Sequence, residues 1–470
     1  KVKPDKRDIV KKLRSKASSA DHIYLASDPD REGEAIAWHV VEELKRSEST
    51  VGRIIFHEIT KKAVQEALEH PQQLNRSLYE AQKARRVMDR IVGYTMSPLL
   101  WKKVRRGLSG GRVQSVAVRL ICMRQEEIEQ FVPKEYWTID VSLKTSTGDT
   151  FTAKVVNPKD IPDEKAAKAI VGTINRAPEI FIEKIKKQVR YKHPLPPFIT
   201  STLQQAASTR LRFSAKKTMM IAQQLYEGIA ISKGEISGLI TYMRTDSPVI
   251  SGEAIKQARD YIPSEYGKTY LPEKPRQYKA KKSAQEAHEA IRPTDVANTP
   301  ERVKSFLTKD QYALYDLIWK RFIASQMNSA AFDQTTVDIS AEDIGLRANG
   351  SIMKFDGFLK VYRITDDKDT DALLPDSIAQ GDRLTLDGIS DKQHFTQPPP
   401  RYTEASLIKE LEEKGIGRPS TYAPIISTIQ DRGYVRLEQR IFIPTELGRD
   451  VNELLVKHYP HILDIGFTAK

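Results

Sequence analysis

The segments of this chain that look β-rich come in two separate runs, and this feature most constrains the fold. Residues 135–190 and 331–397 hold alternating or β-branched stretches such as "YWTIDVSL" and "DRLTLDG", which are typical of strands. Residues 200–328 between them read as mostly helical. We therefore expect a discontinuous β domain that the chain enters twice. With 470 residues and 39% apolar content, the chain can bury several cores, and we expect three or four domains.

The first part of the chain has the pattern of a parallel α/β sheet. Residues 22–44 read as a buried strand, an acidic turn and an amphipathic helix, and residues 53–59 and 60–70 read as a second strand and a second helix. Strands that alternate with helices in this way favour a parallel sheet. From residue 75 to about 131 the pattern turns helical, with a glycine-rich break at "RRGLSGGRVQS".

Two distant segments share one outline. "PPFITSTLQQAASTRLRFSAKKTMMIAQQLYEG" at 196–228 and "PPPRYTEASLIKELEEKGIGRPSTYAPIISTIQDRG" at 398–433 each have a proline lead-in, a Ser/Thr-rich cap, two helices around a short turn and a closing glycine. This outline predicts a helix-turn-helix unit in both places. Such helix pairs bind nucleic acid in some proteins and only pack in others, so the pattern alone leaves both functions open.

The charge balance indicates a polyanionic partner. Lys and Arg number 75 against 62 Asp and Glu, which gives a formal net charge of +13. Such a surplus favours nucleic acid, with an acidic membrane surface as the alternative. No stretch of the sequence approaches the roughly 18 apolar residues of a membrane span. The single cysteine, Cys122, excludes internal disulfides and fits a reducing cytoplasm.

"SDPDREGE" at 27–34 is the densest acidic cluster beside a predicted strand end. Asp28, Asp30 and Glu32 occupy alternate positions there, where an open α/β sheet presents the carboxyl ends of its strands. Three converging carboxylates would repel one another without a cation, so we favour a Mg²⁺ site. The alternative is a solvated turn whose acidic residues favour a helix N-terminus.

Basic residues interleaved with glycine and aromatic residues follow this cluster. "AQKARRVMDRIVGY" and "KKVRRGLSGGRVQS" combine Arg and Lys with Tyr94, Trp101 and several glycines. Glycines let a backbone approach a phosphate, and aromatic rings stack on bases, so the pattern is typical of a surface that follows a single strand. Solvated charge is the alternative. "GIGRPSTY" places Arg418, Ser420 and Thr421 at a predicted helix N-terminus, which suits a phosphate.

The stretch "GLITYMRTDS" at 238–247 brings a phenol and a guanidinium together. Read as a strand, it points Tyr242 and Arg244 the same way, with Met243 opposite. A half-buried strand with a packed tyrosine and a solvated arginine is the alternative.

A second candidate stretch, "AQEAHEAIRPT", would put His288 and Arg292 on one face if it were helical. The sequence contains no G-x-x-x-x-G-K-[ST] phosphate loop. An enzyme that acts on nucleic-acid strands would then have to conserve bond energy in another way, as a covalent tyrosyl ester does.

Six motifs in this sequence resemble those of one enzyme family. "DPDREGEAIAWH", "ARRVMDRIVGY", "GRVQSVAVRLI", "ITYMRTDS", "AHEAIRP" and "GIGRPSTYA" occur in the order seen in bacterial type IA DNA topoisomerases and span almost the whole chain. The Tyr-Met-Arg wording resembles the topoisomerase I branch. The resemblance implies a multidomain α/β and α+β fold that closes into a toroid. It implies a Toprim metal-binding domain at 1–74 that lacks its first strand, a helical DNA-binding domain at 75–134 and 403–470, a β-rich arch at 135–199 and 329–402, and a helix-turn-helix-like domain at 200–328 that carries the tyrosine.

The resemblance also implies a reaction, the ATP-independent relaxation of negatively supercoiled DNA. The tyrosine that matches Tyr242 attacks a phosphodiester of single-stranded DNA and gives a 5′-phosphotyrosyl link. Arg244 would hold the scissile phosphate, and His288 would assist near it. Mg²⁺ on Asp28, Asp30 and Glu32 would support DNA positioning and religation after another strand has passed. The positions that match the single-strand groove are Arg85, Arg86, Asp89, Tyr94, Arg112, Gln114, Ser115, Arg418, Ser420 and Thr421.

Two departures from the family pattern set an expectation for this chain. Family members begin the Toprim domain with a strand and loop that supply a glutamate and a lysine, and many continue into zinc-ribbon or related repeats, whereas this sequence has neither segment. We therefore expect a chain that binds DNA and cleaves it poorly. Separately, we expect a monomer that is cytoplasmic and nucleoid-associated. The alternatives are a Toprim nuclease or primase, a non-enzymatic single-stranded DNA-binding protein, and the topoisomerase part of a reverse gyrase.

Overall fold

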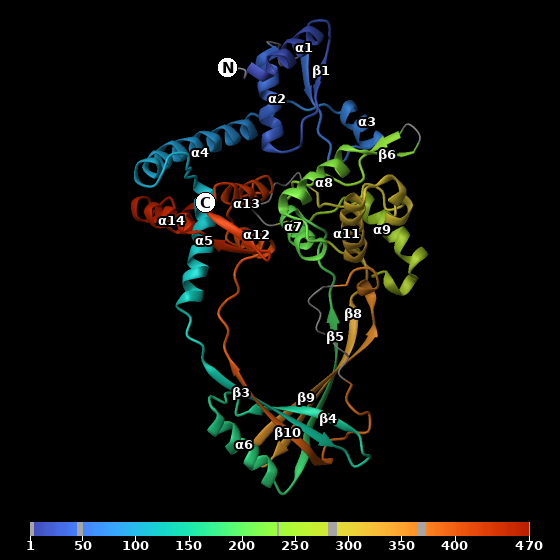
Figure 1. The fold of residues 1–470 in the computed structure, drawn as a ribbon. Coiled ribbons are helices and arrows are strands. Elements are labelled where there is room, and N and C mark those ends of the chain that lie inside the picture. The colour runs from blue at the N-terminus through green and yellow to red at the C-terminus, as the bar shows by residue number, and fades with distance from the viewer. Residues whose placement is uncertain (1–3, 45–49, 233–234, 281–288, 364–372, 470) are drawn as a thin grey trace.

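The chain closes on itself as a ring (Figure 1). The computed structural model describes residues 4–44, 50–232, 235–280, 289–363 and 373–469. Helical parts lie at one end of the ring and a β barrel lies at the other, and extended connections on both sides join them (Figure 1). This arrangement confirms the predicted multidomain toroid of α/β and α+β parts.

The acidic-turn part, residues 4–70, is a small parallel α/β unit. Its elements are η1 (Pro4–Lys6), α1 (Arg7–Ser18), β1 (Ile23–Leu25), α2 (Arg31–Leu44), β2 (Val51–Arg53) and α3 (Lys61–Glu69). β1 pairs with β2 in parallel, as predicted. The second strand, however, does not occupy 53–59. The carbonyls of His57 and Ile59 accept hydrogen bonds from the amides of Tyr242 and Gly238 instead, at 2.7 and 2.8 Å.

A buried ion pair organises this part. The side chains of Arg53 and Glu34 are 1% and 2% exposed, and Nε lies 2.9 Å from Oε2. Glu34 also accepts a hydrogen bond at 2.5 Å from the amide of Asn75, the N-cap of the next helix. The guanidinium donates to three main-chain carbonyls at 2.8 to 2.9 Å, those of Leu25, Asp28 and Ile54. One pair thus joins both strands, α2 and the start of the helical part.

The helical part combines two segments that are far apart in the sequence. Its elements are α4 (Arg76–Lys103), α5 (Arg112–Glu129), α12 (Glu404–Glu413), α13 (Tyr422–Asp431), β11 (Val435–Glu438), β12 (Ile441–Pro444), α14 (Glu446–His458) and α15 (Ile465–Ala469). They share one core, in which Leu100 and Ile121 of the first segment pack with Leu407 and Ile426 of the second. The helical break predicted at the glycine-rich stretch separates α4 from α5.

The barrel confirms that strands come from both predicted β runs. Six strands close in the order β10, β3, β4, β9, β8, β5, with antiparallel neighbours. The barrel elements are β3 (Glu135–Lys144), β4 (Thr150–Asn157), α6 (Glu164–Arg176), β5 (Ile180–Lys192), β8 (Ala330–Ala341), β9 (Ile344–Phe355), η6 (Gly357–Lys360) and β10 (Arg383–Phe395). In β3, residues 139, 141 and 143 are buried, as expected for alternating side chains on a barrel wall.

The tyrosine part, residues 198–328, lies between the two halves of the barrel in sequence. Its elements are α7 (Thr200–Ala206), the π-helix η3 (Ala207–Leu211), α8 (Ala215–Glu227), β6 (Ile229–Ser232), β7 (Glu235–Ser237), α9 (Gly252–Glu265), η4 (Lys268–Tyr270), α10 (Pro300–Val303), η5 (Lys304–Phe306) and α11 (Lys309–Ser325). The α7–α8 and α12–α13 pairs confirm both helix-turn-helix predictions. Gly228 and Gly433 end them with positive φ angles of 119° and 68°.

The strand predicted around Tyr242 is wrong. In the described structure residues 241–250 belong to no helix or strand. Their backbone bonds run to three unrelated segments: the Thr241 amide reaches Arg292, the Tyr242 amide reaches His57, and the Thr245 amide reaches the Thr200 hydroxyl. The stretch is extended, but no single neighbouring strand pairs with it.

We predict that Glu34→Met destabilises the acidic-turn part by about 3–5 kcal/mol, because it leaves the buried Arg53 charge without its partner. Glu43→Met is the matched control, since Glu43 pairs with Arg14 at the surface, where the side chains are 39% and 49% exposed. Its cost should be about 0–1 kcal/mol. Hydrogen exchange of β1 and β2 amides measures both changes, and equal effects would contradict the assignment.

Candidate active site

The phenol of Tyr242 is buried where the tyrosine part meets the acidic-turn part. The residue is 2% exposed, and its hydroxyl donates a 2.6 Å hydrogen bond to Oδ2 of Asp30. The ring of Tyr226 meets it at 65°, with 5.4 Å between centroids. Burial first, and then the negative charge of Asp30, raise the pKa of Tyr242. The phenol is therefore protonated at neutral pH, with a carboxylate placed to accept its proton.

Arg244 shares this site with Tyr242, as the sequence predicts. Its Nη1 lies 3.8 Å from the same Oδ2 of Asp30. Its side chain is 36% exposed, so it is the more accessible of the two. The predicted strand alternation does not cause the proximity, because the segment is not a strand; both side chains converge on one carboxylate.

The acidic turn is held by a close main-chain approach. Oδ1 of Asp30 accepts a 2.7 Å hydrogen bond from the amide of Gly33. A Cβ at Gly33 would lie 2.0 Å from the carbonyl oxygen of Asp28, so only glycine fits at this point of α2. The pKa of Asp28 is raised by burial and then by the charge of Asp30. Two partly buried carboxylates therefore lie close together at the end of β1.

The three predicted metal ligands do not form one cluster. Within the described ranges, no group of three Asp, Glu, His or Cys side chains is arranged to hold a metal ion. α2 begins at Arg31, so Glu32 lies in its first turn. A residue in a helix does not follow the two-residue alternation of an extended segment, so the reasoning that put all three carboxylates on one side does not apply to Glu32. Asp28 and Asp30 still suit Mg²⁺, which commonly uses one or two carboxylates together with water and substrate phosphates.

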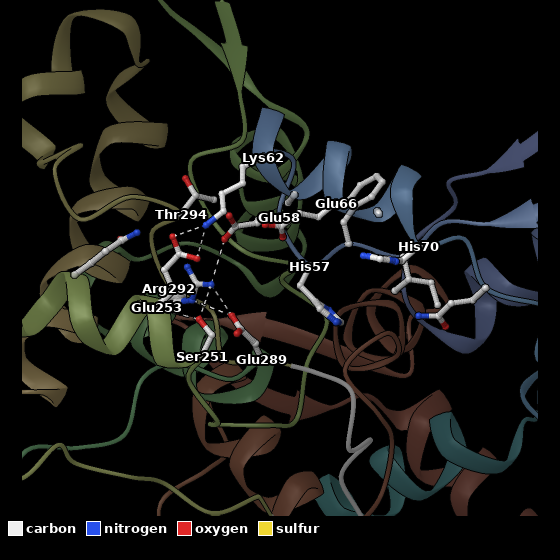
Figure 2. Close-up of a pocket in the computed structure, with 17 residues that line it drawn as sticks. His57, Glu58, Lys62, Glu66, His70, Ser251, Glu253, Glu289, Arg292 and Thr294 are labelled. Carbon is white, nitrogen blue, oxygen red and sulfur yellow. Dashed lines mark hydrogen bonds and ion pairs between the residues drawn. The ribbon is translucent and has the colours of Figure 1, made fainter.

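We call the contact between residues 57–62 and the tyrosine part the seam. Arg292 crosses it: Nη2 lies 3.2 Å from Oε2 of Glu58 and 2.7 Å from Oε2 of Glu289. Lys62 and Glu253 form a second, exposed pair at 2.8 Å. These groups line a cavity of about 360 Å³ along the seam (Figure 2). Burial is the largest influence on the pKa of Glu58 and raises it.

The predicted helical face of His288 and Arg292 is not found. Arg292 lies in an extended segment whose neighbours form isolated bridges, Ile291 with Phe198 and Pro293 with Ile240. His288 lies outside the described residues.

The predicted groove residues on α4 and α5 surround an exposed apolar strip. Oδ1 and Oδ2 of Asp89 lie 3.4 and 3.7 Å from Nε of Arg112 and Arg85. Arg90 lies over the ring of Tyr94, whose side chain is among those exposed on α4. The other exposed apolar residues of this helix are Val87, Met88, Ile91 and Trp101. A surface that combines open rings with arginines can stack bases and hold phosphates.

Two further groove residues, Gln114 and Ser115, stabilise the glycine-rich turn before α5 and its N-terminus. Nε2 of Gln114 donates to the carbonyl of Ser109 at 2.9 Å, and Oγ of Ser115 accepts from the amide of Gly111 at 3.2 Å. The predicted Arg86 is exposed on α4.

At the second helix-turn-helix unit, Arg418 turns back onto its own loop. Its Nη1 donates to the carbonyls of Gly417 and Gly415 at 2.7 and 3.2 Å. Thr421 is the N-cap of α13 and accepts from the Arg418 amide at 2.8 Å, and Ser420 is half-buried beside it. The structure therefore places all three residues at a helix N-terminus, as predicted.

Sequence reasoning missed the groups that hold the site together. These groups are Glu34, Arg53, His57, Glu58 and Thr200. One signal was available for Arg53, a charged residue directly before the apolar run "IIF". The other residues act through backbone hydrogen bonds or through contacts with residues far away in the sequence. Such contacts leave no local pattern in the sequence.

Comparisons with known proteins give one consistent result. A family model described as DNA topoisomerase matches residues 73–470, and the Toprim domain model matches residues 1–59. The solved structure of full-length topoisomerase I from Thermotoga maritima is similar at a TM-score of 0.86 and 39% identity; the match covers 100% of this chain and 76% of that one. None of the helices in the described part of the chain has the length and apolar character needed to cross a membrane.

We predict that Arg292→Met loosens the seam by about 1–3 kcal/mol, because it leaves Glu58 and Glu289 without their shared cation. The amides of Tyr242 and Gly238, which bond to His57 and Ile59 across the seam, should then exchange hydrogen faster. Lys62→Met removes only the exposed pair and should change this exchange by less than about 1 kcal/mol. A larger effect from Lys62→Met than from Arg292→Met would refute the prediction.

Proposed function

The chain belongs to the bacterial type IA DNA topoisomerases, and from this premise we propose which of its residues carry out the reaction. It is an isomerase that relaxes DNA by strand cleavage and strand passage, with DNA as its substrate and without ATP. The residues below, the single-stranded character of the bound segment and the metal are proposals that rest on the geometry of the site.

Tyr242 is the proposed nucleophile. The observation that carries this assignment is its buried phenol, bonded to Asp30 with Arg244 beside the same carboxylate. Asp30 accepts the phenolic proton, and the phenolate oxygen attacks the phosphorus of a single-stranded phosphodiester. The bond from phosphorus to the 3′-oxygen breaks, and that oxygen takes a proton from solvent water and leaves as a hydroxyl. The product is a 5′-phosphotyrosyl ester, and attack by the same hydroxyl reverses the step after strand passage.

Arg244 is the proposed partner of the scissile phosphate. It carries a permanent charge, lies near the phenol and is exposed enough to reach an entering phosphate. Its contact with Asp30 is loose at 3.8 Å, so a phosphate oxygen can replace the carboxylate. It then stabilises the negative charge that develops on the phosphate oxygens in the transition state. His288 is proposed to assist beside it, on the resemblance alone.

Mg²⁺ is the proposed cofactor. Asp28 and Asp30 would hold it, with Glu32 nearby on α2. When bound, the ion neutralises their charge and lets a DNA phosphate approach. This assignment is supported by the raised pKa of Asp28, which burial raises most and the charge of the buried Asp30 raises next, because a bound cation would offset both effects.

The groove along α4 and the α13 loop is proposed to bind single-stranded DNA. Open rings and aliphatic side chains on α4 suit bases, and the arginines around them suit phosphates. The residues proposed for this contact are Arg85, Arg86, Asp89, Tyr94, Arg112, Gln114, Ser115, Arg418, Ser420 and Thr421. We further propose that the enzyme acts as a monomer in the cytoplasm, on nucleoid DNA.

We predict that covalent attachment to DNA requires the hydroxyl of Tyr242 and not that of its neighbour Tyr226. An oligonucleotide labelled on the 3′ side of the cut is incubated with protein and Mg²⁺, denatured with SDS and resolved on a gel. The unaltered chain should retain label on the protein, and Tyr242→Phe should retain none while binding DNA equally well. Tyr226→Phe is the control, because it removes a hydroxyl from the same core. Cut DNA without attached protein would indicate a nuclease, and label retained by Tyr242→Phe would exclude this nucleophile.

We predict that removal of the metal separates binding from relaxation. EDTA should leave the gel shift of single-stranded DNA intact and stop relaxation of a supercoiled plasmid, and added Mg²⁺ should restore it. Asp28→Asn should raise the Mg²⁺ concentration required, whereas Glu42→Gln, on an exposed face of α2, should not change it. Relaxation in EDTA at the original rate would overturn the cofactor assignment.

A further inference from the structure

We propose that two buried hydroxyls, those of Thr200 and Thr241, are positioning groups that hold Tyr242 and Arg244 in their reactive geometry. The inference rests on the proposed roles of Tyr242 and Arg244. Neither threonine touches the reacting atoms; each acts through the backbone of the segment that carries them.

The Thr200 hydroxyl binds the backbone on both sides of Arg244. It donates to the carbonyl of Met243 at 2.7 Å and accepts from the amide of Thr245 at 2.8 Å. The amide of Thr200 donates to the carbonyl of Thr245 at 2.9 Å. Thr200 is fully buried at the first position of α7. One side chain therefore fixes the peptide units on either side of Arg244 and the direction in which its guanidinium leaves the backbone.

The Thr241 hydroxyl, directly before Tyr242 in the sequence, also makes two backbone hydrogen bonds, both to residues 290–292. It donates to the carbonyl of Ala290 at 2.7 Å and accepts from the amide of Arg292 at 3.0 Å. The amide of Thr241 donates to the carbonyl of Arg292 at 2.9 Å. The residue is 1% exposed. We call the hydrogen bonds of each of these threonines a clamp. The Thr241 clamp joins the tyrosine segment to the segment that carries Arg292, whose guanidinium forms the buried part of the seam.

The hydrogen bonds of Thr200 and Thr241 lie where they can hold Tyr242 and Arg244 in place when the seam opens. A regular strand would be held by a ladder of backbone bonds, but residues 241–250 have none in the described structure. The amide of Tyr242 bonds across the seam to His57, and any opening at the seam breaks that bond. Both threonine clamps lie entirely within the tyrosine part and survive such an opening. They are the contacts that can keep Tyr242 and Arg244 in register from cleavage until religation.

Thr200→Val tests the first clamp, because valine keeps the shape and removes only the hydroxyl. The expected result is about a tenfold fall in the rate of covalent-complex formation on a pre-bound oligonucleotide, since a small misplacement of reacting groups slows a reaction by one to two orders of magnitude. The dissociation constant for DNA should stay within about twofold, because Thr200 lies outside the groove. Thr200→Ser keeps the hydroxyl and should restore the rate.

Thr202→Val is the matched control. Its hydroxyl, also in the first turn of α7, accepts from the amide of Ile199 at 3.0 Å, so the variant loses a helix-cap bond without touching the tyrosine segment. Cleavage by Thr202→Val should match that of the unaltered chain. Equal rates for Thr200→Val and Thr202→Val, or failure of Thr200→Ser to restore the rate, would overturn the proposal.

A second pair of variants covers the case in which Thr200→Val does not fold. Thr241→Val should slow cleavage in the same way, whereas Thr294→Val should not. The Thr294 hydroxyl is buried too and donates to the carbonyl of Gly238 at 2.7 Å, but it lies farther from the reactive pair along the chain. Equal rates for these two variants would also overturn the proposal.

The same assay separates this proposal from the proposed function. If Tyr242→Phe still gives labelled protein, or the unaltered chain gives none, then the assignment of the nucleophile fails and the role of the clamps fails with it. If labelled protein depends on Tyr242 but is insensitive to both threonine hydroxyls, then only the positioning inference fails.

Discussion

The hydrogen bond between the Tyr242 phenol and the Asp30 carboxylate is the contact that joins the tyrosine part to the acidic turn at the candidate active site. It joins residues 212 positions apart in sequence and places the nucleophile against the acidic turn. It also keeps the phenol protonated and buried, so the closed form without DNA is a resting state. In the proposed mechanism an entering phosphate takes the place of Asp30 beside Arg244, while Asp30 keeps its hydrogen bond to the Tyr242 phenol and can accept its proton. Substrate binding and activation of the proposed nucleophile would then both act on this carboxylate.

The ion pairs of the acidic-turn part and of the seam differ in burial. This difference explains why the acidic-turn part stays folded whereas the seam can open. The Arg53–Glu34 pair is almost fully buried and lies inside the acidic-turn part, so breaking it leaves an uncompensated charge. The ion pairs across the seam are that of Arg292 with the partly exposed Glu58 and the fully exposed Lys62–Glu253 pair, and water can replace the second at little cost. The molecule can therefore open at the seam while its parts stay folded.

Sequence patterns predicted the elements whose hydrogen bonds are local. The two helix pairs, the α4–α5 break and the parallel β1–β2 pattern follow from periodicity, caps and glycine positions, and they are found as expected. The failures share one cause. The strand expected at 53–59 and the strand around Tyr242 both give way to backbone bonds with remote segments, which periodicity does not report. The described residues next to Arg292 likewise form isolated bridges with remote residues. The expected cluster of three carboxylates is not found. α2 begins at Arg31, so Glu32 is already helical and does not follow the alternation assumed for Asp28 and Asp30.

The charged residues of the candidate active site and those of the groove on α4 are connected by direct contacts between the acidic-turn part and α4. α4, which carries the arginines and open rings, packs on α2 through Trp38 and Tyr79, whose rings stack at 4.8 Å. Its N-cap amide binds Glu34 of the buried ion pair. The groove proposed for a single strand is thereby connected to the part that carries Asp28 and Asp30, whose carboxylates would repel phosphates. Basic side chains can supply the affinity for DNA, and we propose that the last approach needs Arg244 and a cation, so binding without chemistry is the expected behaviour whenever either is missing.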